Sequence, residues 1–181
     1  GVIEWLVIRK LRKKLISKAR GKVLEVGIGT GRNLAYYPNL CKISGIDLSK
    51  EMLKIARKRA EKLGRRVVLK VGNAEKLPFR NKEFDTIVDT LGLCTYPNPV
   101  KALKEMKRVC KKNGKILLLE HGESSNFLIR KLQNWIKKKQ LERLGCYVDR
   151  NPSQLVLGAG LKIERIERRF FGIIYVIEAK P

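Results

Sequence analysis

Short apolar runs alternate along the chain with longer stretches in which apolar residues recur every three or four positions. The short runs have the length and the Val and Ile content of strands, and they predict seven of them, at 22–26, 42–46, 67–71, 86–89, 116–120, 162–166 and 173–179. Alternation of strands with helices is typical of a parallel sheet with crossover helices, so the predicted fold class is α/β. Only residues 167–172 separate the last two strands, which is too short for a parallel crossover. These two strands are therefore predicted to pair as an antiparallel hairpin.

Two of the longer stretches predict amphipathic helices that cover the sheet. Residues 49–63 begin with Ser49 as a candidate N-cap, and their predicted apolar face consists of Met52, Ile55, Ala56, Ala60 and Leu63. Residues 99–110 repeat the spacing with Val100, Leu103, Met106 and Val109. The Asn113-Gly114 pair that follows is predicted to end this second helix in a turn.

Two basic segments stand outside this alternation. Residues 1–20 are predicted to be a basic amphipathic N-terminal helix, because from Ile3 to Arg20 the apolar Trp5, Leu6, Ile8, Leu11, Leu15 and Ile16 are interleaved with Arg9, Lys10, Arg12, Lys13, Lys14 and Lys18. Such a helix can lie on an anionic membrane surface, or it can pack its apolar side on the protein. Residues 122–150 are predicted to be a substrate-side insertion between strands five and six, and there Phe127, Leu128, Leu132, Trp135, Ile136 and Leu141 alternate with Arg and Lys.

Length and charge refine this picture. The 181 residues (20.8 kDa) fit one domain, 21–181, after the N-terminal helix, and no apolar run approaches the roughly 18 residues that a membrane span needs. The sequence begins with Gly1 rather than Met, so the question whether a segment such as a removed signal or anchor precedes it stays open. The net charge of +24 favours a polyanion or an anionic surface as partner, although a Lys-rich composition also occurs in proteins of hyperthermophiles.

A glycine-rich turn directly follows the first strand. Residues 25–31 read Glu-Val-Gly-Ile-Gly-Thr-Gly and lead into a helix-compatible stretch near Arg32, so that bare backbone close to a helix start can meet a ligand. Asp47 lies twenty residues after Gly27, just past the second strand, where a carboxylate can accept both hydroxyls of a ribose. Arg32 stands where the dinucleotide fingerprint needs its third glycine, and the P-loop motif is missing. The pattern therefore indicates a nucleoside ligand that is neither a dinucleotide nor a P-loop nucleotide.

With these residues in place, 22–181 resembles the class I S-adenosylmethionine-dependent methyltransferases. The resemblance implies a Rossmann-like, seven-stranded, mostly parallel sheet with helices on both faces and a C-terminal antiparallel hairpin. It also implies S-adenosylmethionine as cofactor, with S-adenosylhomocysteine as product. Residue by residue, it implies that Glu25 helps to hold the methionine end, that Gly27, Gly29 and Gly31 approach the cofactor, and that Asp47 binds the ribose with Leu48 and Met52 nearby.

A second stretch narrows the resemblance. Residues 72–79, Gly-Asn-Ala-Glu-Lys-Leu-Pro-Phe, are similar to the G-D-A-x-x-L-P-F sequence of the ubiquinone/menaquinone methyltransferase-like branch. This similarity implies that Asn73 and Ala74 lie at the adenine edge, with Asn73 standing where Asp is usual, and an amide can still accept and donate hydrogen bonds there. The strand-four motif follows at 84–88, and the stretch after it, Thr90, Leu91, Gly92, Leu93 and Cys94, is implied to line the far side of the cofactor.

Six further positions carry side chains that can take part in chemistry or metal binding. His121 directly follows the fifth strand at the carboxyl edge, and we interpret it as a catalytic base or substrate contact, with a structural histidine as the alternative. Asp85 is interpreted as a buried acid that accepts from backbone amides at the start of a strand. The cysteines are scattered without a C-x-x-C pair, so the sequence predicts reduced thiols in a cytoplasmic protein and indicates neither a metal site nor a disulfide framework; they are Cys41, Cys94, Cys110 and Cys146.

The acceptor is the least constrained part of the function. Two short motifs, Glu120-His121 and the G-C-x-x-x-R sequence at 145–150, are similar to sequences in two groups of enzymes. These groups are the methyltransferases of the membrane-associated thiol (methyltransferase-like 7) type and the bacterial phospholipid N-methyltransferases. Together with the N-terminal helix they favour a lipophilic acceptor, first the amine of a phosphatidylethanolamine head group, then a quinone precursor or a small thiol. They also favour a cytoplasmic protein with a peripheral membrane contact. The alternatives from other classes are an RNA-binding protein or RNA methyltransferase and a non-catalytic binding protein. No RNA-binding module is recognised in the sequence, which argues against the first two.

Overall fold

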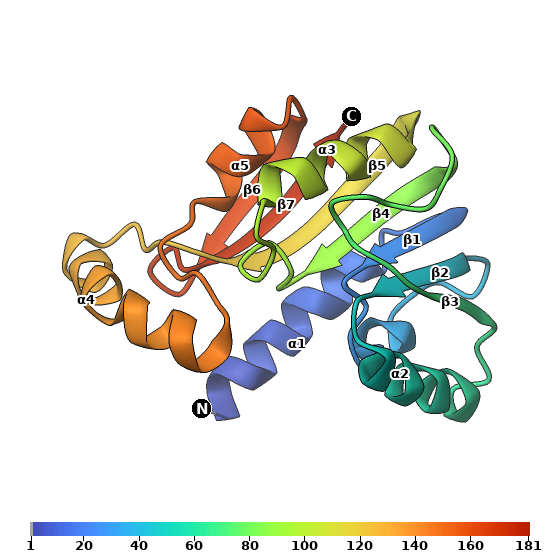
Figure 1. Cartoon of the computed structure of the whole chain (residues 1–181), viewed down its shortest axis with the longest axis horizontal. Helices are drawn as coiled ribbons and strands as arrows, with labels where there is room; N and C mark the ends of the chain where they lie inside the picture. Colours follow the sequence, from blue (N-terminus) through green and yellow to red (C-terminus); the bar gives the residue numbers. More distant parts are fainter. Residues whose placement is uncertain (1) are drawn as a thin grey trace.

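The computed structural model describes the backbone of residues 2–181 and the side chains of 8–143 and 145–181. Seven strands form one sheet in the order β3-β2-β1-β4-β5-β7-β6 (Figure 1). The strands are β1 (Lys22–Val26), β2 (Lys42–Asp47), β3 (Val67–Val71), β4 (Phe84–Thr90), β5 (Cys110–His121), β6 (Lys162–Arg169) and β7 (Ile174–Lys180). The helices are α1 (Val2–Ile16), the short 3₁₀ helix η1 (Arg32–Ala35), α2 (Lys50–Lys62), α3 (Pro99–Val109), α4 (Phe127–Leu144) and α5 (Pro152–Gly158).

Strands β1 to β5 run parallel, and β7 is antiparallel to both of its neighbours, β5 and β6. The α/β class, the seven strands and the antiparallel C-terminal hairpin are therefore confirmed. The hairpin connection is shorter than predicted, because β6 continues to Arg169 and only residues 170–173 turn the chain. Phe170 and Phe171 adopt positive φ values of 52° in this turn, a backbone region that side chains other than glycine seldom occupy.

Helices cover both faces of the sheet, as predicted (Figure 1). On one face α3 and α5 pack on β5, β6 and β7, and on the other face α1 and α2 pack with η1. Each face has its own core, the first centred on residues such as Leu103, Met106 and Ile116, the second on residues such as Leu15 and Leu117. Beyond the end of the sheet at which β4 and β5 finish, α4 stands apart from both layers (Figure 1).

The buried face of α2 differs from the prediction. Ser49 is its N-cap, and the Ser49 hydroxyl accepts from the Met52 amide at 3.1 Å. However, α2 covers only the edge of the sheet at β2 and β3, so a narrow stripe is buried. This stripe is Leu53, Ala56 and Ala60, whereas Met52, Ile55 and Leu63 are exposed.

The predicted turn at Asn113-Gly114 is a bulge within β5. The strand begins at Cys110, directly after α3, and Cys110 pairs with Phe84 while Lys115 pairs with Thr86. Residues 111–114 therefore bulge out opposite a single residue of β4, Asp85. Asp85 accepts from the Lys22 amide at 2.8 Å, as predicted for a strand-start acid, but it is half-buried rather than buried because it also pairs with Lys111 in solvent.

The glycine turn after β1 leads to less helix than predicted. Residues 32–35 form the single 3₁₀ turn η1 in place of a longer helix, and the crossover to β2 continues as loop.

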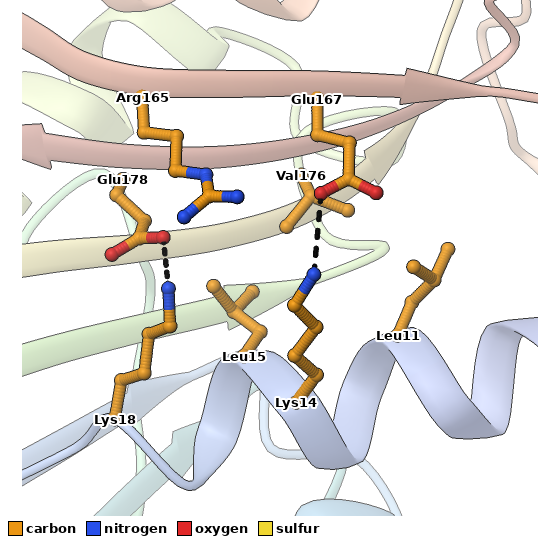
Figure 2. A pocket seen from close by; sticks show the side chains of 8 residues that line it. All are labelled: Leu11, Lys14, Leu15, Lys18, Arg165, Glu167, Val176 and Glu178. Carbon is orange, nitrogen blue, oxygen red and sulfur yellow. Dashed lines mark hydrogen bonds and ion pairs between the residues drawn. The ribbon is translucent and has the colours of Figure 1, made fainter.

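The described part of α1 packs on the protein. Leu11, Leu15 and Ile16 are buried in the core. Lys14 pairs with Glu167 of β6 and Lys18 with Glu178 of β7, which fastens the helix along the hairpin (Figure 2). The side chains of Trp5 and Leu6, on which the predicted apolar face also depends, lie outside the described residues. Among the described helices, none combines the length and apolar content that a bilayer crossing requires.

Arg12 provides a test of which contacts hold α1. It is 9% exposed, and its guanidinium donates to Asn33 Oδ1 at 2.6 Å and to Thr90 Oγ1 at 2.9 Å. Because Arg12→Ala leaves buried polar partners unpaired, we expect it to lower the free energy of unfolding by about 2–4 kcal/mol. Lys18→Ala removes a partly exposed ion pair and should cost about 1 kcal/mol or less. Chemical denaturation of both variants checks this, and equal losses would contradict it.

Candidate functional site

The strand order reverses direction between β1 and β4, and ligands of open α/β sheets bind beyond the carboxyl ends of the strands at such a point. A cavity of about 570 Å³ lies there, which we call the edge pocket. Eight of the residues predicted for the site line it, namely Gly27, Gly29, Asp47, Leu48, Met52, Asn73, Ala74 and Leu91. Gly92, from the 90–94 stretch implied to line the far side of the cofactor, lines it as well. The residues that sequence reasoning did not select are Ile46, Ser49, Gly72, Thr95, Tyr96 and Pro97.

Asp47 is held in place by backbone amides. Its Oδ2 accepts from the Gly29 amide at 2.8 Å, and its Oδ1 accepts from the Ser49 amide at 2.9 Å. An ionised carboxylate has about four acceptor positions, so each oxygen keeps capacity for a further donor. The side chain can therefore take two hydroxyl groups of a ligand without giving up the bonds that orient it.

The glycine turn leaves space for a ligand at one position in particular. Gly29 has φ +54°, and a Cβ placed there would meet only the Gly27 carbonyl, at 3.9 Å, so the backbone faces open room. A Cβ on Gly27 would lie 2.7 Å from the Tyr96 hydroxyl, which requires glycine there. Gly31 was predicted to approach the cofactor, but it is not among the residues that line the edge pocket. A Cβ at this position would press on Leu34 and on Ala56 of α2. Its role is the close approach of the turn to α2.

Glu25 and Thr90 also lie behind the wall of the edge pocket rather than in it. The Glu25 carboxylate is buried and accepts from Asn33 Nδ2 at 2.7 Å and from the Tyr37 hydroxyl at 2.8 Å. Burial raises the pKa of Glu25 to about 7. These contacts orient the carboxylate, because a buried carboxylate must find its partners inside the protein. The implied role of Glu25 in helping to hold the methionine end stays a prediction. Thr90 likewise accepts from Arg12 and Asn33.

Asn73 uses its amide oxygen to shape the loop after β3. The oxygen accepts from the Glu75 amide at 2.8 Å, so the side chain closes a turn on its own backbone. Asn73 also lines the edge pocket, and its side-chain amide can accept one further hydrogen bond at the oxygen and donate from its N–H groups. The neighbouring Ala74 is buried and packs beneath the pocket.

Two buried acids beneath the edge pocket were missed as site residues. Asp89 of β4 accepts from the Tyr96 hydroxyl at 3.3 Å, and its second oxygen, Oδ2, has no hydrogen-bond partner among the described residues. Glu120 of β5 accepts from the amides of Gly92 and Leu93 at 3.3 and 3.2 Å. Burial raises the pKa of Asp89 to about 8 and that of Glu120 well above its ordinary value. The signal in the sequence was an acid near the end of each of two apolar strands.

The position of His121 differs from that expected of a base in the edge pocket. It does not line this pocket, and its Nε2 lies 2.9 Å from the Sγ of Cys146. Burial lowers the pKa of His121, so the imidazole is neutral at pH 7. A catalytic role for His121 thus stays a prediction without a contact to the edge pocket.

The polar groups of the edge pocket define the ligand that fits. Asp47 can receive two hydroxyls, the Asn73 loop offers polar groups to a flat ring, and the open backbone at Gly29 allows close approach. The Asp89 carboxylate lies beside the pocket with its Oδ1 close to Gly27 and Gly92, its Oδ2 has no hydrogen-bond partner among the described residues, and a positive charge nearby would stabilise the ionised form. A ligand with vicinal hydroxyls, a flat base and a positive charge fits these four features of the pocket.

Comparison with known proteins agrees with this chemistry. The family described as "Methyltransferase domain" matches residues 24–118, more than half of the chain. Methyltransferase OMS1, mitochondrial, of Saccharomyces cerevisiae is 32% identical over 97% of this chain and 41% of its own length. A phosphatidylethanolamine N-methyltransferase of Cereibacter sphaeroides is 40% identical over 56% of this chain and 51% of its own length. The chain thus spans about half the length, or less, of these curated relatives.

The fold is shared with solved structures as well. A SAM-dependent methyltransferase from Aquifex aeolicus superposes with a TM-score of 0.70, at 21% identity, over 95% of this chain and 88% of that one. This chain therefore belongs to the family of S-adenosylmethionine-dependent methyltransferase domains, whose cofactor carries vicinal hydroxyls, an adenine base and a positively charged sulfur.

Proposed function

We propose that this domain methylates a lipophilic acceptor at a membrane surface, and that the leading acceptor is the amine of a phosphatidylethanolamine head group. When bound, S-adenosylmethionine supplies a methyl group on a positively charged sulfur, a good leaving group. The chain's own residues have to hold the cofactor, exclude water and align the acceptor, and little further chemistry is required of them. The relative from Cereibacter sphaeroides supports an amine acceptor, although it matches only part of this chain.

The observation that carries the proposal is an exposed apolar stripe on α4. Leu128, Leu132 and Trp135 follow one another at steps of four and three residues, so they share one face of the helix. Phe127 is the first residue of the helix and precedes this stripe. All four are exposed, Trp135 to 82%. Such a stripe on an otherwise polar surface indicates a site that contacts an apolar partner.

Cations surround this stripe. Lys131, Lys138 and Lys139 are exposed on the same helix, and apolar residues flanked by Lys are typical of helices that lie in the interface of an anionic bilayer. The helix is fastened to the domain by Gln133, which accepts from the Ser124 amide at 2.8 Å and donates to the Gly122 carbonyl at 3.0 Å. Because α4 follows the carboxyl end of β5, docking of this stripe would bring that edge of the sheet to the membrane.

A basic groove offers a second contact for anions. It has a volume of about 630 Å³, lies between α1, η1 and α2, and shares no lining residue with the edge pocket. Its described lining contains five cations and no carboxylate; the cations are Arg9, Arg12, Arg32, Arg59 and Lys62. Several of these side chains also bind within the protein, as Arg59 does to Thr30, so the groove is a pre-arranged positive surface. Phosphates of a lipid surface would be favoured there.

Incubation with methyl-labelled S-adenosylmethionine tests the acceptor. We expect the label in the lipid fraction of a total extract, on the head group of phosphatidylethanolamine. Label in a quinone or small-thiol fraction would overturn the head-group assignment but keep methyl transfer. Label in RNA alone would overturn the lipophilic acceptor altogether.

Flotation with liposomes tests the membrane contact. The double variant Leu128→Ser/Trp135→Ser should lose most of its binding to anionic liposomes at low salt, because two apolar anchors are removed. The matched control is Leu40→Ser/Leu157→Ser, which alters two exposed apolar residues on other surfaces. Binding of the parent chain should weaken in salt, since each cation near an anionic leaflet contributes about 1 kcal/mol.

The same assay separates α4 from the N-terminal helix. Lys10→Ser/Lys13→Ser changes two exposed cations of α1 and tests the predicted membrane role of residues 3–20. If the α4 variant floats as well as its control, the stripe is not the docking surface. If the parent chain does not float at low salt, the membrane proposal is wrong.

A further inference from the structure

Three side chains that commonly bind metal ions converge at the end of the sheet beside α4. Cys94 comes from the loop after β4, His121 is the last residue of β5, and Cys146 follows α4. One ligand atom of each lies within 4.8 Å of the other two, and the Cys146 Sγ is 2.9 Å from the His121 Nε2. Residues that are far apart in the sequence thus form one cluster, which the absence of a C-x-x-C pair did not reveal.

The spacing suits a single ion. Zinc binds sulfur at about 2.3 Å and histidine nitrogen at about 2.0–2.1 Å in tetrahedral geometry, so its ligand atoms lie roughly 3.5–4 Å apart. Two thiolates and one imidazole are soft ligands that favour zinc over magnesium or calcium. Three protein ligands leave one tetrahedral position for water or another small ligand. Small side-chain rotations suffice to move atoms that already lie within 4.8 Å into this arrangement.

The backbone that carries the ligands is held by hydrogen bonds from two sides. The Tyr147 amide donates to the Cys94 carbonyl at 2.9 Å, which ties the two cysteine segments together. Arg150 donates to the Leu93 and Tyr96 carbonyls, and Glu120 accepts from the Leu93 amide. The loop before and after Cys94 is therefore fixed before an ion arrives. Fixed ligand segments of this kind are what a metal site requires.

We propose that Cys94, His121 and Cys146 bind one zinc ion with a fourth position open to a small exogenous ligand. The ion would join the ends of β4 and β5 to the segment after α4 and so fix the position of α4. His121 would serve as a ligand through its neutral imidazole in place of the base that its sequence position suggested. The proposed metal site does not depend on the identity of the methyl acceptor. It can therefore be confirmed or overturned independently of the proposed function.

Metal content of the purified chain tests the proposal directly. Tag-free protein is reduced, loaded with zinc or cobalt, dialysed and measured by elemental analysis. We expect one ion per chain and, with cobalt, the intense visible bands of four-coordinate geometry together with thiolate-to-cobalt charge transfer. Zinc should also raise the thermal midpoint in the absence of any cofactor, because it binds the folded state.

Variants assign the ligands. Cys94→Ser, Cys146→Ser and His121→Ala should each weaken cobalt binding by about 100-fold or more, and the cysteine variants should each reduce the charge-transfer band. Cys41→Ser is the matched control, because Cys41 is half-buried and its Sγ faces the Ala19 carbonyl away from the cluster. Equal loss in Cys41→Ser would overturn the assignment.

Two results with the unaltered chain would overturn the proposal even if the variants fail to fold. One is the absence of stoichiometric metal after loading under reducing conditions. The other is a Cys94–Cys146 disulfide that persists under those conditions, seen as resistance of both thiols to alkylation and an intact mass lower by one pair of hydrogens.

Discussion

Replacing Asp47 with Ala is expected to weaken the binding of S-adenosylmethionine by about 100-fold or more. The carboxylate is oriented by the amides of Gly29 and Ser49 and has room for both ribose hydroxyls. Each charge-assisted hydrogen bond contributes about 1.5–3 kcal/mol, and water in the variant replaces part of this. Calorimetric titration with the cofactor and with its demethylated product measures the loss.

The control for this substitution is Glu164→Ala. It also removes one carboxylate, but from the exposed part of β6, where Glu164 pairs with Lys180. We expect its affinity to be unchanged. An Asp47→Ala variant that is folded by circular dichroism and binds the cofactor as tightly as the parent would show that the ribose is held elsewhere.

Asp89→Asn is expected to stabilise the ligand-free protein. The ordinary pKa of this carboxyl is 3.8 and burial raises it to about 8, so between these values the folded state holds a proton that the unfolded chain has released. The free energy of unfolding therefore falls as the pH rises from about 4 to about 8. Asparagine removes this dependence, and we expect it to raise the free energy of unfolding at pH 7 by about 2–4 kcal/mol. Denaturation curves at several pH values measure both effects.

The same variant should bind the cofactor more weakly and with less pH dependence. A positively charged ligand favours ionised Asp89, so the affinity of the parent chain should rise by about tenfold between pH 6.5 and pH 8.5. Glu25, on the far side of the glycine turn, has a pKa raised to about 7 and its charge raises the pKa of Asp89, while the Asp89 charge raises that of Glu120. The difference between parent and variant therefore reports the removal of the Asp89 charge together with its effect on these two acids. Identical slopes in the two proteins would contradict the role of Asp89 in holding the positive charge.

Predictions that depend on local pattern succeeded for the sheet and for the place of Asp47 in the edge pocket. Strand β1 and the turn after it could be recognised because alternation, glycine spacing and the position of Asp47 are all local properties of the chain. The structure then brought residues from the ends of β1, β2, β3 and β4 into one pocket, as a parallel sheet requires. These successes concern features in which neighbouring residues determine the conformation.

The errors concern features that depend on distant partners. The contacts of the Glu25 carboxylate with Asn33 and Tyr37 were not foreseen, because no spacing rule reveals them, and its role at the methionine end stays a prediction. Leu53 rather than Met52 is buried because only the edge of the sheet lies beneath α2. Asp89 was passed over because an acid within an apolar strand gives no sign of the side chains that will surround it. The meeting of Cys94 with Cys146 is likewise a property of the folded chain.

The position of β7 affects how the domain is made. This strand follows the six other strands along the chain, yet it lies between β5 and β6, so β6 has no strand to pair with until residues 174–180 are available. Until then β5 is a bare edge with unpaired backbone groups, which favours pairing with other chains. A chain that stops before residue 174 would therefore lose the pairing of two strands rather than one, together with the Glu178 anchor of α1. Residues 174–180 are thus required for this sheet to close.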